Sequence, residues 1–273
     1  MIIYEMRDTM IKNWDEFLIP YEQAVEELKV KFKSIRKEFR DMNEYSPIEF
    51  VTGRVKEISN IIEKSRIKKV DIEEIEDIAG IRIICQLVTD IPEVVKIIKN
   101  RDGKDLKIIE ERDYIRNQKE SGYRSYHVII SYPVHTAFGE KEILGEIQIR
   151  TLAMNFWATI EHSINYKFDK NIPKDLRKRL KNAAEAANKL DEEMSKIKHE
   201  IIDAQEIFMI KSSLIAKILK KIQFLYFSGN IEKEKLKKLQ EEFYLYRENG
   251  SIEDLRNLNR RLEELNQKYY IND

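Results

Sequence analysis

The first pattern in the chain is a stripe of apolar residues that predicts a long helix from about Trp14 to Met42. Apolar side chains recur there at alternating spacings of four and three, at Tyr21, Val25, Leu28, Phe32, Ile35 and Phe39. This spacing places them on one face of a helix. Ser46-Pro47 then interrupts the pattern. We expect a second helix from near Pro47 to Lys69, in which Gly53 marks a bend or a close approach to a neighbour.

The middle of the chain alternates between strand and helix patterns. Residues 79–88 are apolar and β-branched, which predicts a buried strand. Residues 91–100 predict a short helix entered through Pro92. Further strands are expected at about 107–112, 125–132 and 142–150, the last two joined by a turn at Gly139. The alternation predicts an α/β fold, in which helices pack on a mixed sheet.

After Thr151 the sequence predicts helices only. They are expected at 151–168, 174–228, 231–248 and 251–270, and Asn249-Gly250 gives a C-cap and turn between the last two. We predict one domain over residues 1–207 and a helical extension over residues 208–273. The extension carries an apolar stripe at Leu214, Ile218, Ile222 and Leu225. The sequence leaves open whether this stripe docks on its own domain, on a neighbouring subunit or on another partner.

The composition is that of a highly charged but balanced protein. Of its 273 residues 36% are charged, and the formal net charge is zero. This balance argues against broad nucleic-acid binding, which usually brings a basic excess, so no obligatory nucleic-acid partner is expected. The apolar runs are too short to span a membrane, and the N-terminal ten residues lack a signal-peptide core. The single cysteine, Cys85, suits a reducing compartment, and we expect a cytoplasmic protein.

Two predicted strands carry polar side chains where a buried sheet would normally hold Val or Ile. Tyr123, Ser125 and His127 share one parity in the first stretch, and Glu146, Gln148 and Arg150 share one face of the second. Burying such groups is costly unless they are paired or bind something. The two stretches therefore predict an active site.

Asp77 and Glu146 are candidate metal ligands. Asp77 lies just before the strand that starts near Ala79, and Glu146 lies in the last strand of the sheet. Carboxylates on neighbouring strands can hold Mg²⁺, which prefers carboxylates together with substrate phosphates. The pattern also allows a plainer interpretation, in which Asp77 caps a turn and Glu146 is a surface residue.

Several cations are expected near these carboxylates. They are Arg54, Lys56, Lys64, Arg112, Lys119 and Arg124, and together they suggest a site for nucleotide phosphates. A solvated helix face would explain Lys56 and Lys64 equally well. Tyr123 can stack on a base, although a lone tyrosine, like His127, is more often a packed residue. The chain has no P-loop motif.

Four stretches resemble the synthetase domain of RelA/SpoT-type enzymes, most closely the small alarmone synthetases of the RelQ type. They are Ser46–Lys56 (SPIEFVTGRVK), Glu76–Arg82 (EDIAGIR), Ser121–His127 (SGYRSYH) and Gly145–Thr151 (GEIQIRT), and Asn155–His162 with Tyr166-Lys167 extends the match. The resemblance covers roughly Trp14 to Gln205 in the family's order, so it is highly specific.

This resemblance implies both a fold and a reaction. The family's enzymes transfer the β,γ-pyrophosphate of ATP to the 3′-hydroxyl of GTP or GDP, giving AMP and (p)ppGpp, on a nucleotidyltransferase-like domain. Matched by motif, Arg54 and Arg112 would stack on adenine, Lys56 and Lys64 would hold ATP phosphates, and Asp77 and Glu146 would hold Mg²⁺. Glu146 would also help to deprotonate the 3′-hydroxyl, and Gln148 would support the site. Tyr123 would stack on guanine, and Lys119 and His127 would contact the acceptor nucleotide. A related transferase that uses another purine acceptor, such as ATP, remains an alternative. A regulator without catalysis is disfavoured because both acids are present.

The resemblance also changes the interpretation of a basic stripe on the first helix. Lys29, Lys33, Arg36 and Arg40 would by pattern alone be a solvated face. RelQ-type enzymes form homotetramers with a central cleft for the alarmone, and Lys29, Lys33, Arg36, Glu49, Thr52 and Asn155 match that cleft. The resemblance thus implies a homotetramer with an allosteric pppGpp site. The chain has no His-Asp hydrolase motif, so (p)ppGpp hydrolysis is not expected.

Overall fold

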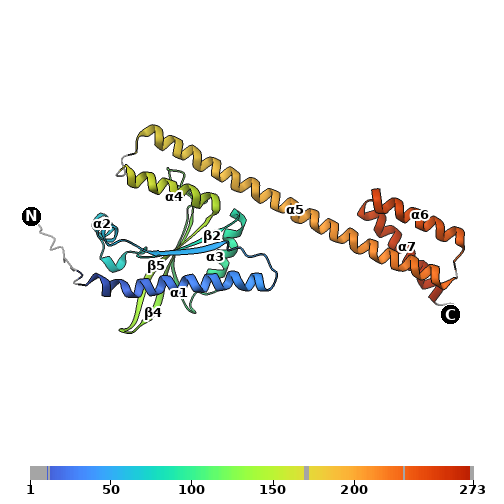
Figure 1. Ribbon diagram of the computed structural model, residues 1–273, viewed down its shortest axis with the longest axis horizontal. Coiled ribbons are helices and arrows are strands. Elements are labelled where there is room, and N and C mark those ends of the chain that lie inside the picture. Colours follow the sequence, from blue (N-terminus) through green and yellow to red (C-terminus); the bar gives the residue numbers. More distant parts are fainter. Residues whose placement is uncertain (1–10, 12, 169–171, 230, 271–273) are drawn as a thin grey trace, which may run out of the picture. The chain divides into compact units, whose positions relative to one another are not determined.

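A computed structural model describes residues 11, 13–168, 172–229 and 231–270 of the chain (Figure 1). The helices are α1 (Trp14–Asp41), α2 (Ile58–Lys68), α3 (Ile91–Lys99), α4 (Leu152–Lys167), α5 (Lys174–Ser228), α6 (Lys233–Asn249) and α7 (Ile252–Tyr270). The strands are β1 (Phe50–Val55), β2 (Ala79–Cys85), β3 (Lys107–Asp113), β4 (Tyr126–Thr136) and β5 (Gly139–Thr151), and Ile72–Glu74 and Val88–Asp90 form short 3-10 helices.

The chain divides into two compact units, Met1–Ser195 and Lys196–Asp273. The boundary falls within α5, as does residue 207, where the sequence analysis placed the end of the first domain. That domain assignment stays a prediction. The N-terminal ten residues, in which the sequence has no signal-peptide core, lie outside the described residues.

The five strands form one mixed sheet in the first unit, in the order β1-β2-β5-β4-β3. β2 and β5 pair in parallel, and the other neighbours pair antiparallel. β4 and β5 are joined by the predicted hairpin, in which Thr136 pairs with Gly139. The predicted α/β fold, with helices on a mixed sheet, is confirmed.

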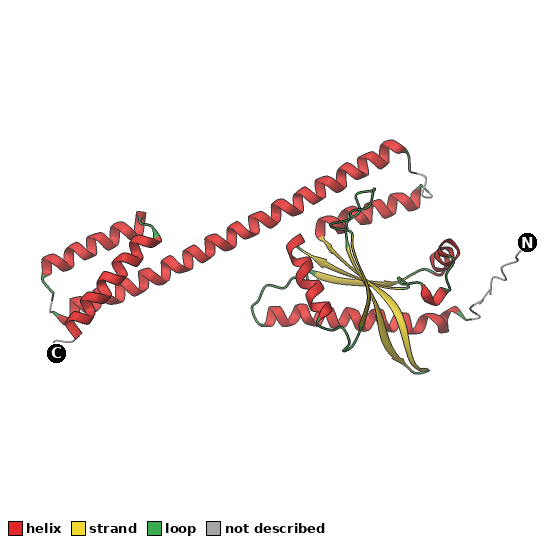
Figure 2. Ribbon diagram, turned by 180° about the vertical axis from the view of Figure 1, so that it is seen from behind, coloured by secondary structure: helices red, strands yellow, loops and turns green. Residues whose placement is uncertain are grey.

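The sheet has an apolar face and a polar face. The apolar face of the sheet forms the core of the unit together with α1 and α3. This core contains Ile81 and Ile83 of β2, Ile147 and Ile149 of β5, Val25, Leu28 and Phe32 of α1, and Val94 and Ile98 of α3. Because successive side chains of a strand point to opposite faces, Arg82, Glu146 and Gln148 project from the other face. α4 lies on that polar side, opposite α1 (Figure 2), and its Trp157 packs with Tyr123.

The expected helix from Pro47 to Lys69 was wrong over its first half, where the structure has β1 instead. Residues 50–55 pair with β2 from Phe50↔Ile84 to Val55↔Ala79, so their backbone hydrogen bonds belong to the sheet. Period-2 alternation and the β-branched Val51 and Thr52 favour this strand. The expected close approach at Gly53 is confirmed, because a Cβ there would lie 2.8 Å from Val25 Cγ1.

The second unit is a helical assembly with a core of its own. The stripe on α5 packs against α6 and α7 through Ile218, Ile222 and Leu225 with Leu236, Leu239, Phe243, Leu255, Leu258 and Leu262. Leu214 lies at the edge of the same cluster. The unit thus buries its own apolar stripe, which resolves a question that the sequence left open.

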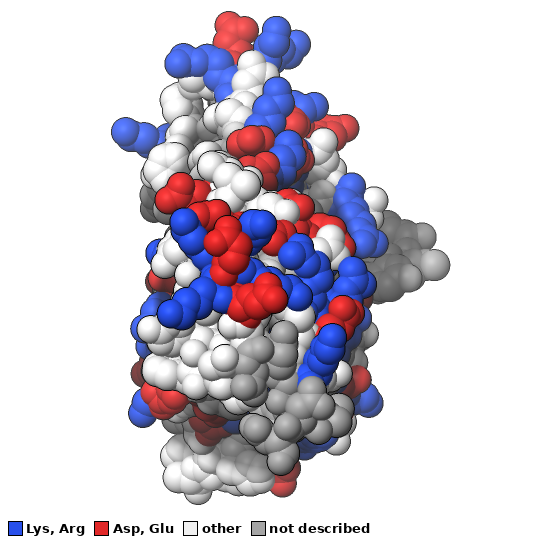
Figure 3. Space-filling model, turned by 90° about the vertical axis from the view of Figure 1, so that its right-hand side faces the viewer, with Lys and Arg blue, Asp and Glu red and all other residues white. Residues whose placement is uncertain are grey.

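Charge is mixed on one face of the protein. On the face drawn in Figure 3, basic and acidic side chains are interspersed, as expected from a net charge of zero. In the second unit Arg261 makes a two-pronged contact with Glu242, at 2.6 and 2.9 Å, and Lys221 pairs with Glu263. Among the described helices, none is both long enough and apolar enough to cross a membrane.

A buried carboxylate ties β5 to α5 within the first unit. Thr151 Oγ1 donates to Asp191 Oδ2 at 2.5 Å, and only 4% of Asp191 is exposed. Burial raises the pKa of Asp191 to about 6, although the hydrogen bond from Thr151 opposes the shift. The folded chain therefore keeps this proton over a pH range in which the unfolded chain releases it.

Replacing Gly53 by Val should lower the free energy of unfolding by about 1–3 kcal/mol, because the new side chain meets Val25 and Ile81 in a packed core. Gly80→Ala is the matched control, since its Cβ would make only an ordinary contact of 3.5 Å with the Arg54 carbonyl oxygen. Denaturation followed by tryptophan fluorescence measures the effect on the first unit, which contains both tryptophans, Trp14 and Trp157. Equal loss in both variants would contradict the close approach.

Replacing Asp191 by Asn should remove a pH-dependent loss of stability. Because the folded pKa is raised, the stabilisation is complete below the unfolded pKa of 3.8 and is lost as the pH rises through about 6. The stability of Asp191→Asn relative to wild type should therefore rise by roughly 1–3 kcal/mol between pH 4 and pH 7. Thermal unfolding across this pH range measures the difference in stability. Asp175→Asn is the control, because Asp175 is an exposed residue of the same helix. A difference that does not vary with pH would refute the assignment.

Candidate active site

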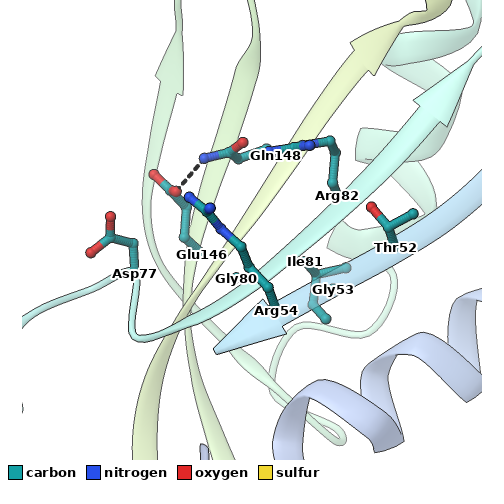
Figure 4. Close-up of a pocket in the computed structure, with 9 residues that line it drawn as sticks. All are labelled: Thr52, Gly53, Arg54, Asp77, Gly80, Ile81, Arg82, Glu146 and Gln148. Atoms are coloured by element: carbon teal, nitrogen blue, oxygen red, sulfur yellow. Dashed lines mark hydrogen bonds between the residues drawn. The ribbon is translucent and has the colours of Figure 1, made fainter. Parts of the chain in front are cut away.

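The polar face of the sheet contains a cavity of about 150 Å³ at β1, β2 and β5. Its lining consists of Thr52, Gly53, Arg54, Asp77, Gly80, Ile81, Arg82, Glu146 and Gln148. In Figure 4 the side chains of Arg54, Asp77 and Glu146 project to the same side of the sheet. The register explains the grouping, because Gly80 of β2 lies beside Glu146 of β5 and Arg54 of β1 lies beside Gly80.

Asp77 is held by two lysines that come from different elements. Lys56, just after β1, and Lys64 of α2 approach Asp77 Oδ2 at 2.9 and 2.8 Å. Burial disfavours the charged carboxylate, but the hydrogen bonds and charges of the two lysines prevail and lower the pKa of Asp77. Asp77 Oδ1 is buried and has no hydrogen-bond partner among the described residues. One carboxylate oxygen is thus available to a further ligand.

Glu146 is buried, with 8% of the residue exposed, and each of its oxygens is hydrogen-bonded. His127 Nδ1 lies 2.8 Å from Oε1, and Gln148 Nε2 donates to Oε2 at 2.6 Å. Burial opposes ionisation, but these two partners and the charge of Lys64 outweigh it and lower the pKa of Glu146 to about 2. Glu146 is therefore an anion at neutral pH.

Tyr123 lies in the loop before β4, next to His127. Its hydroxyl is 2.8 Å from His127 Nε2 and accepts a hydrogen bond of 2.7 Å from Arg150 Nη2. Lys119 Nζ lies 5.1 Å from the centre of the Tyr123 ring, close enough for a cation–π contact. The preceding Gly122 has a φ of +87°, and a Cβ there would lie 2.6 Å from Ala184 Cβ, so the turn requires glycine.

Two cationic side chains of the site had no role assigned from the sequence. Arg82 lines the cavity, and its Nε is buried without a hydrogen-bond partner in the part of the chain that the structure describes. Burial, together with the charges of Arg150 and Arg54, lowers the pKa of Arg82 to about 10. Arg150, on β5, contacts Tyr123 and Gln148. Both lie in predicted strands, and Arg82 alternates with isoleucines, a signal that sequence parity provides.

Other residues predicted for the site lie outside the cavity lining. Arg112 of β3 binds Glu76 through two hydrogen bonds of 3.0 and 2.7 Å, and it also contacts Glu110. Arg124, a predicted neighbour of the phosphates, instead donates to the Ala184 carbonyl oxygen and to Glu185 of α5. Arg124 therefore anchors the loop, and Arg112 is engaged by carboxylates.

The residues matched to the regulatory cleft are distributed over three elements. Arg36 of α1 pairs with Glu49 at 3.3 Å, and Gln86 donates to the other Glu49 oxygen at 2.9 Å. Lys29 pairs with Glu26, and Lys33 is exposed on the same helix. Thr52 lines the active-site cavity, and Asn155 lies on α4 with a buried Oδ1 that has no partner among the described residues.

Comparison with known proteins matches residues 53–171 to the family model described as "Region found in RelA / SpoT proteins". The chain is 56% identical to a GTP pyrophosphokinase of Bacillus subtilis, YjbM, over 203 residues, which are 73% of this chain and 95% of that protein. This chain belongs to the RelA/SpoT family. The predicted resemblance is confirmed, and it places the chain with small members of the family rather than with the long ones.

Two solved structures of B. subtilis small alarmone synthetase 1 are similar in fold to this RelA/SpoT-family chain. The structure bound to its product pppGpp has a TM-score of 0.66 and 56% identity, and the match covers 69% of this chain and 98% of that one. The structure bound to AMPCPP has a TM-score of 0.63 and 53% identity, with coverage of 70% and 98%. About 30% of this chain therefore lies outside the match to these structures.

The carboxylates of this family member suit one hard divalent cation. Among the described residues no three His, Cys, Asp or Glu side chains form a metal cluster. Mg²⁺, however, is commonly held by one or two carboxylates together with substrate phosphates. Asp77 and Glu146 line one cavity, and the unpartnered, buried Asp77 Oδ1 is an oxygen of the kind that such an ion prefers. The donor set therefore fits Mg²⁺ bound together with a nucleotide.

Proposed function

We infer that this chain is a GTP diphosphokinase, which transfers the β,γ-pyrophosphate of ATP to the 3′-hydroxyl of GTP or GDP and releases AMP and (p)ppGpp. The observation that carries this inference is the pair of carboxylates, Asp77 and Glu146, in one cavity with Arg54 and Arg82. Membership of the RelA/SpoT family, at 56% identity to a GTP pyrophosphokinase, supports the reaction. The product is a stringent-response alarmone.

In this proposal the donor nucleotide binds on the cationic side of the cavity. Arg54 provides a planar cation for stacking on adenine, which a lysine would match less well. Lys56 and Lys64 approach the phosphates from the side of Asp77. Arg112 can keep its hydrogen bonds to Glu76 and Glu110 while a face of its guanidinium stacks on the adenine.

The acceptor nucleotide binds on the side of β4 in this proposal. Tyr123 stacks on the base, and Lys119 and His127 contact the same nucleotide, with Gln148 supporting Glu146. Lys119, which lies 5.1 Å from the centre of the Tyr123 ring, is close enough to contact a nucleotide whose base stacks there. Tyr123 stacking does not distinguish guanine from adenine, so GTP and ATP as acceptors are separated by competition in the same assay.

Asp77 and Glu146 act mainly as anions in the proposed mechanism. Bound Mg²⁺ would neutralise the transferred group and lower the pKa of the attacking hydroxyl. Because its lowered pKa keeps Glu146 ionised, this carboxylate orients the 3′-hydroxyl and accepts its proton. The arginines and lysines hold the phosphates in line, which supplies most of the catalysis in such transfers.

We further propose a homotetramer in the cytoplasm, with pppGpp as an allosteric ligand at Lys29, Lys33, Arg36, Glu49, Thr52 and Asn155. The Arg36–Glu49 pair and the unpartnered Asn155 Oδ1 are the features of this set that support a polar binding site. The position of Thr52 in the active-site cavity supports coupling between the two sites through β1. The buried, unpaired Cys85 fits a reducing compartment.

Glu146→Gln should lower kcat for AMP and (p)ppGpp formation by about 100-fold or more, because it removes the anion that faces the metal and the hydroxyl. The assay mixes ATP, GTP and Mg²⁺, and anion exchange resolves the products. Glu140→Gln, an exposed acid on the same strand, should keep wild-type activity. Wild-type protein that makes neither AMP nor (p)ppGpp would refute the function, whereas a fully active Glu146→Gln would refute only the residue assignment.

Lys33→Ala combined with Arg36→Ala should abolish activation by pppGpp and leave the basal rate within about two-fold, because neither side chain lines the active-site cavity. Initial rates with and without added pppGpp measure the effect, and light scattering measures the assembly. Lys37→Ala, another exposed lysine of α1, is the matched control. Undiminished activation in the double variant would refute the allosteric assignment, and a monomeric wild type would refute the tetramer.

A further inference from the structure

Five side chains of the polar sheet face close into one ring of hydrogen bonds. Arg150 Nη2 contacts both the Tyr123 hydroxyl and Gln148 Oε1, each at 2.7 Å. From Tyr123 the ring continues to His127 Nε2 at 2.8 Å, and His127 Nδ1 lies 2.8 Å from Glu146 Oε1. From Gln148 the amide nitrogen reaches Glu146 Oε2 at 2.6 Å. Two branches therefore connect Arg150 to Glu146.

The chemistry of the two ends restricts the direction of the bonds in this ring. A guanidinium only donates and an ionised carboxylate only accepts. Arg150 donates to the Tyr123 hydroxyl, and in the His127 tautomer with its proton on Nδ1, toward Glu146, Tyr123 donates to Nε2. In the other branch the Gln148 oxygen faces Arg150 and its amide nitrogen faces Glu146. All bonds run from the cation to the anion, so no donor meets another donor.

Arg150 has an unusual environment for a buried cation. Only 5% of it is exposed, and within the described part of the chain it makes no direct ion pair. Its Nε donates to Ser125 Oγ at 3.3 Å, and Ser125 in turn donates to the Ile149 carbonyl oxygen. Its guanidinium carbon lies 5.1 Å from the centre of the Tyr123 ring. Among the described residues, the hydrogen-bond partners of Arg150 are the side chains of Ser125, Tyr123 and Gln148.

We propose that Arg150 is the positioning residue of the acceptor side, which holds Tyr123 in place and sets the hydrogen bonds that Gln148 and His127 make to Glu146. The proposal rests on the roles given above to Tyr123 and Glu146. Without Arg150 the Gln148 amide oxygen loses its donor and only the bond to Glu146 orients the amide, while the Tyr123 hydroxyl loses the donor that directs it toward His127. Residues that orient others in this way typically contribute about 10–100-fold to activity or affinity.

Arg150→Met should therefore weaken binding of the acceptor nucleotide and slow the chemical step, but it should not change binding of the donor nucleotide. We expect kcat to fall about 10–100-fold and the Kd for GDP to rise about ten-fold, while the Kd for a non-hydrolysable ATP analogue stays within about two-fold. Calorimetry with EDTA present measures GDP binding without any metal. Arg150→Lys keeps the charge and should recover part of the GDP affinity, although lysine lacks the planar arrangement of donors.

A double-mutant cycle separates positioning from a general structural effect. Gln148→Met breaks the same branch, so the kcat losses of Arg150→Met and Gln148→Met should be clearly less than additive when combined. Arg124→Met is the control, because Arg124 is also a buried arginine near Tyr123 but contacts Ala184 and Glu185 outside the ring. Its effect on kcat should add to that of Gln148→Met.

Three outcomes would overturn the proposal. They are unchanged GDP binding in Arg150→Met, equal weakening of GDP and ATP-analogue binding, and additive effects of Arg150→Met and Gln148→Met. If Arg150→Met does not fold, Tyr123→Phe removes the hydroxyl of the other branch while keeping the aromatic side chain. The double-mutant cycle of Tyr123→Phe with Gln148→Met then takes its place, and additive losses of kcat would overturn the proposal. These outcomes are distinguishable from failure of the proposed function, in which the wild-type protein itself would make no (p)ppGpp.

Discussion

The parallel pairing of β2 with β5 is the constraint on which the site depends. It sets Gly80 beside Glu146 and Arg82 beside Gln148, and the chain enters β2 directly from Asp77. A slip of one residue would turn Glu146 and Gln148 toward α1 and expose Ile147 and Ile149 on the polar face. Burial of the isoleucines against α1 therefore specifies where the carboxylates lie, so the apolar core determines the geometry of the site.

The side chains around the two carboxylates carry more positive than negative charge. Lys56 and Lys64 converge on Asp77, whereas the partly buried Arg82 and the buried Arg150 make no ion pair among the described residues. The lowered pKa of Arg82, caused by burial and by its cationic neighbours, indicates that this arrangement is electrostatically unfavourable without an anion. A polyphosphate would relieve that repulsion, so part of the cost of building the site is recovered when a nucleotide binds.

Hydrophobic periodicity predicted most of the fold, and it failed at residues 50–55, where a strand was taken for the start of a helix. The pattern over 14–42 and the helices after Thr151 were predicted correctly, because long amphipathic segments give an unambiguous signal. β1 was missed because six residues with a central glycine are too short to distinguish a strand from the start of a helix. Its identity comes from pairing with β2, which is a long-range interaction.

The candidate site could be predicted as a set of residues but not as a network. Parity alone placed Glu146, Gln148 and Arg150 on one face, and the motifs brought in Asp77, Lys56 and Lys64. The contact between His127 and Glu146 depends on the antiparallel register of β4 and β5, in which His127 lies opposite Gln148. The contact between Arg112 and Glu76 could not be predicted either, because Glu76 lies in a distant segment that a strand pattern does not place.

The ring through Arg150 gives a physical reason for an ionised glutamate inside a sheet. A buried carboxylate is normally costly, and a single nearby cation would reduce that cost by direct pairing. Here the cation acts through two branches of hydrogen bonds, so both oxygens of Glu146 receive hydrogen bonds from groups that Arg150 orients at their far side. The carboxylate remains ionised without being covered by a guanidinium, and its charge is therefore still available to a metal ion or to an attacking hydroxyl.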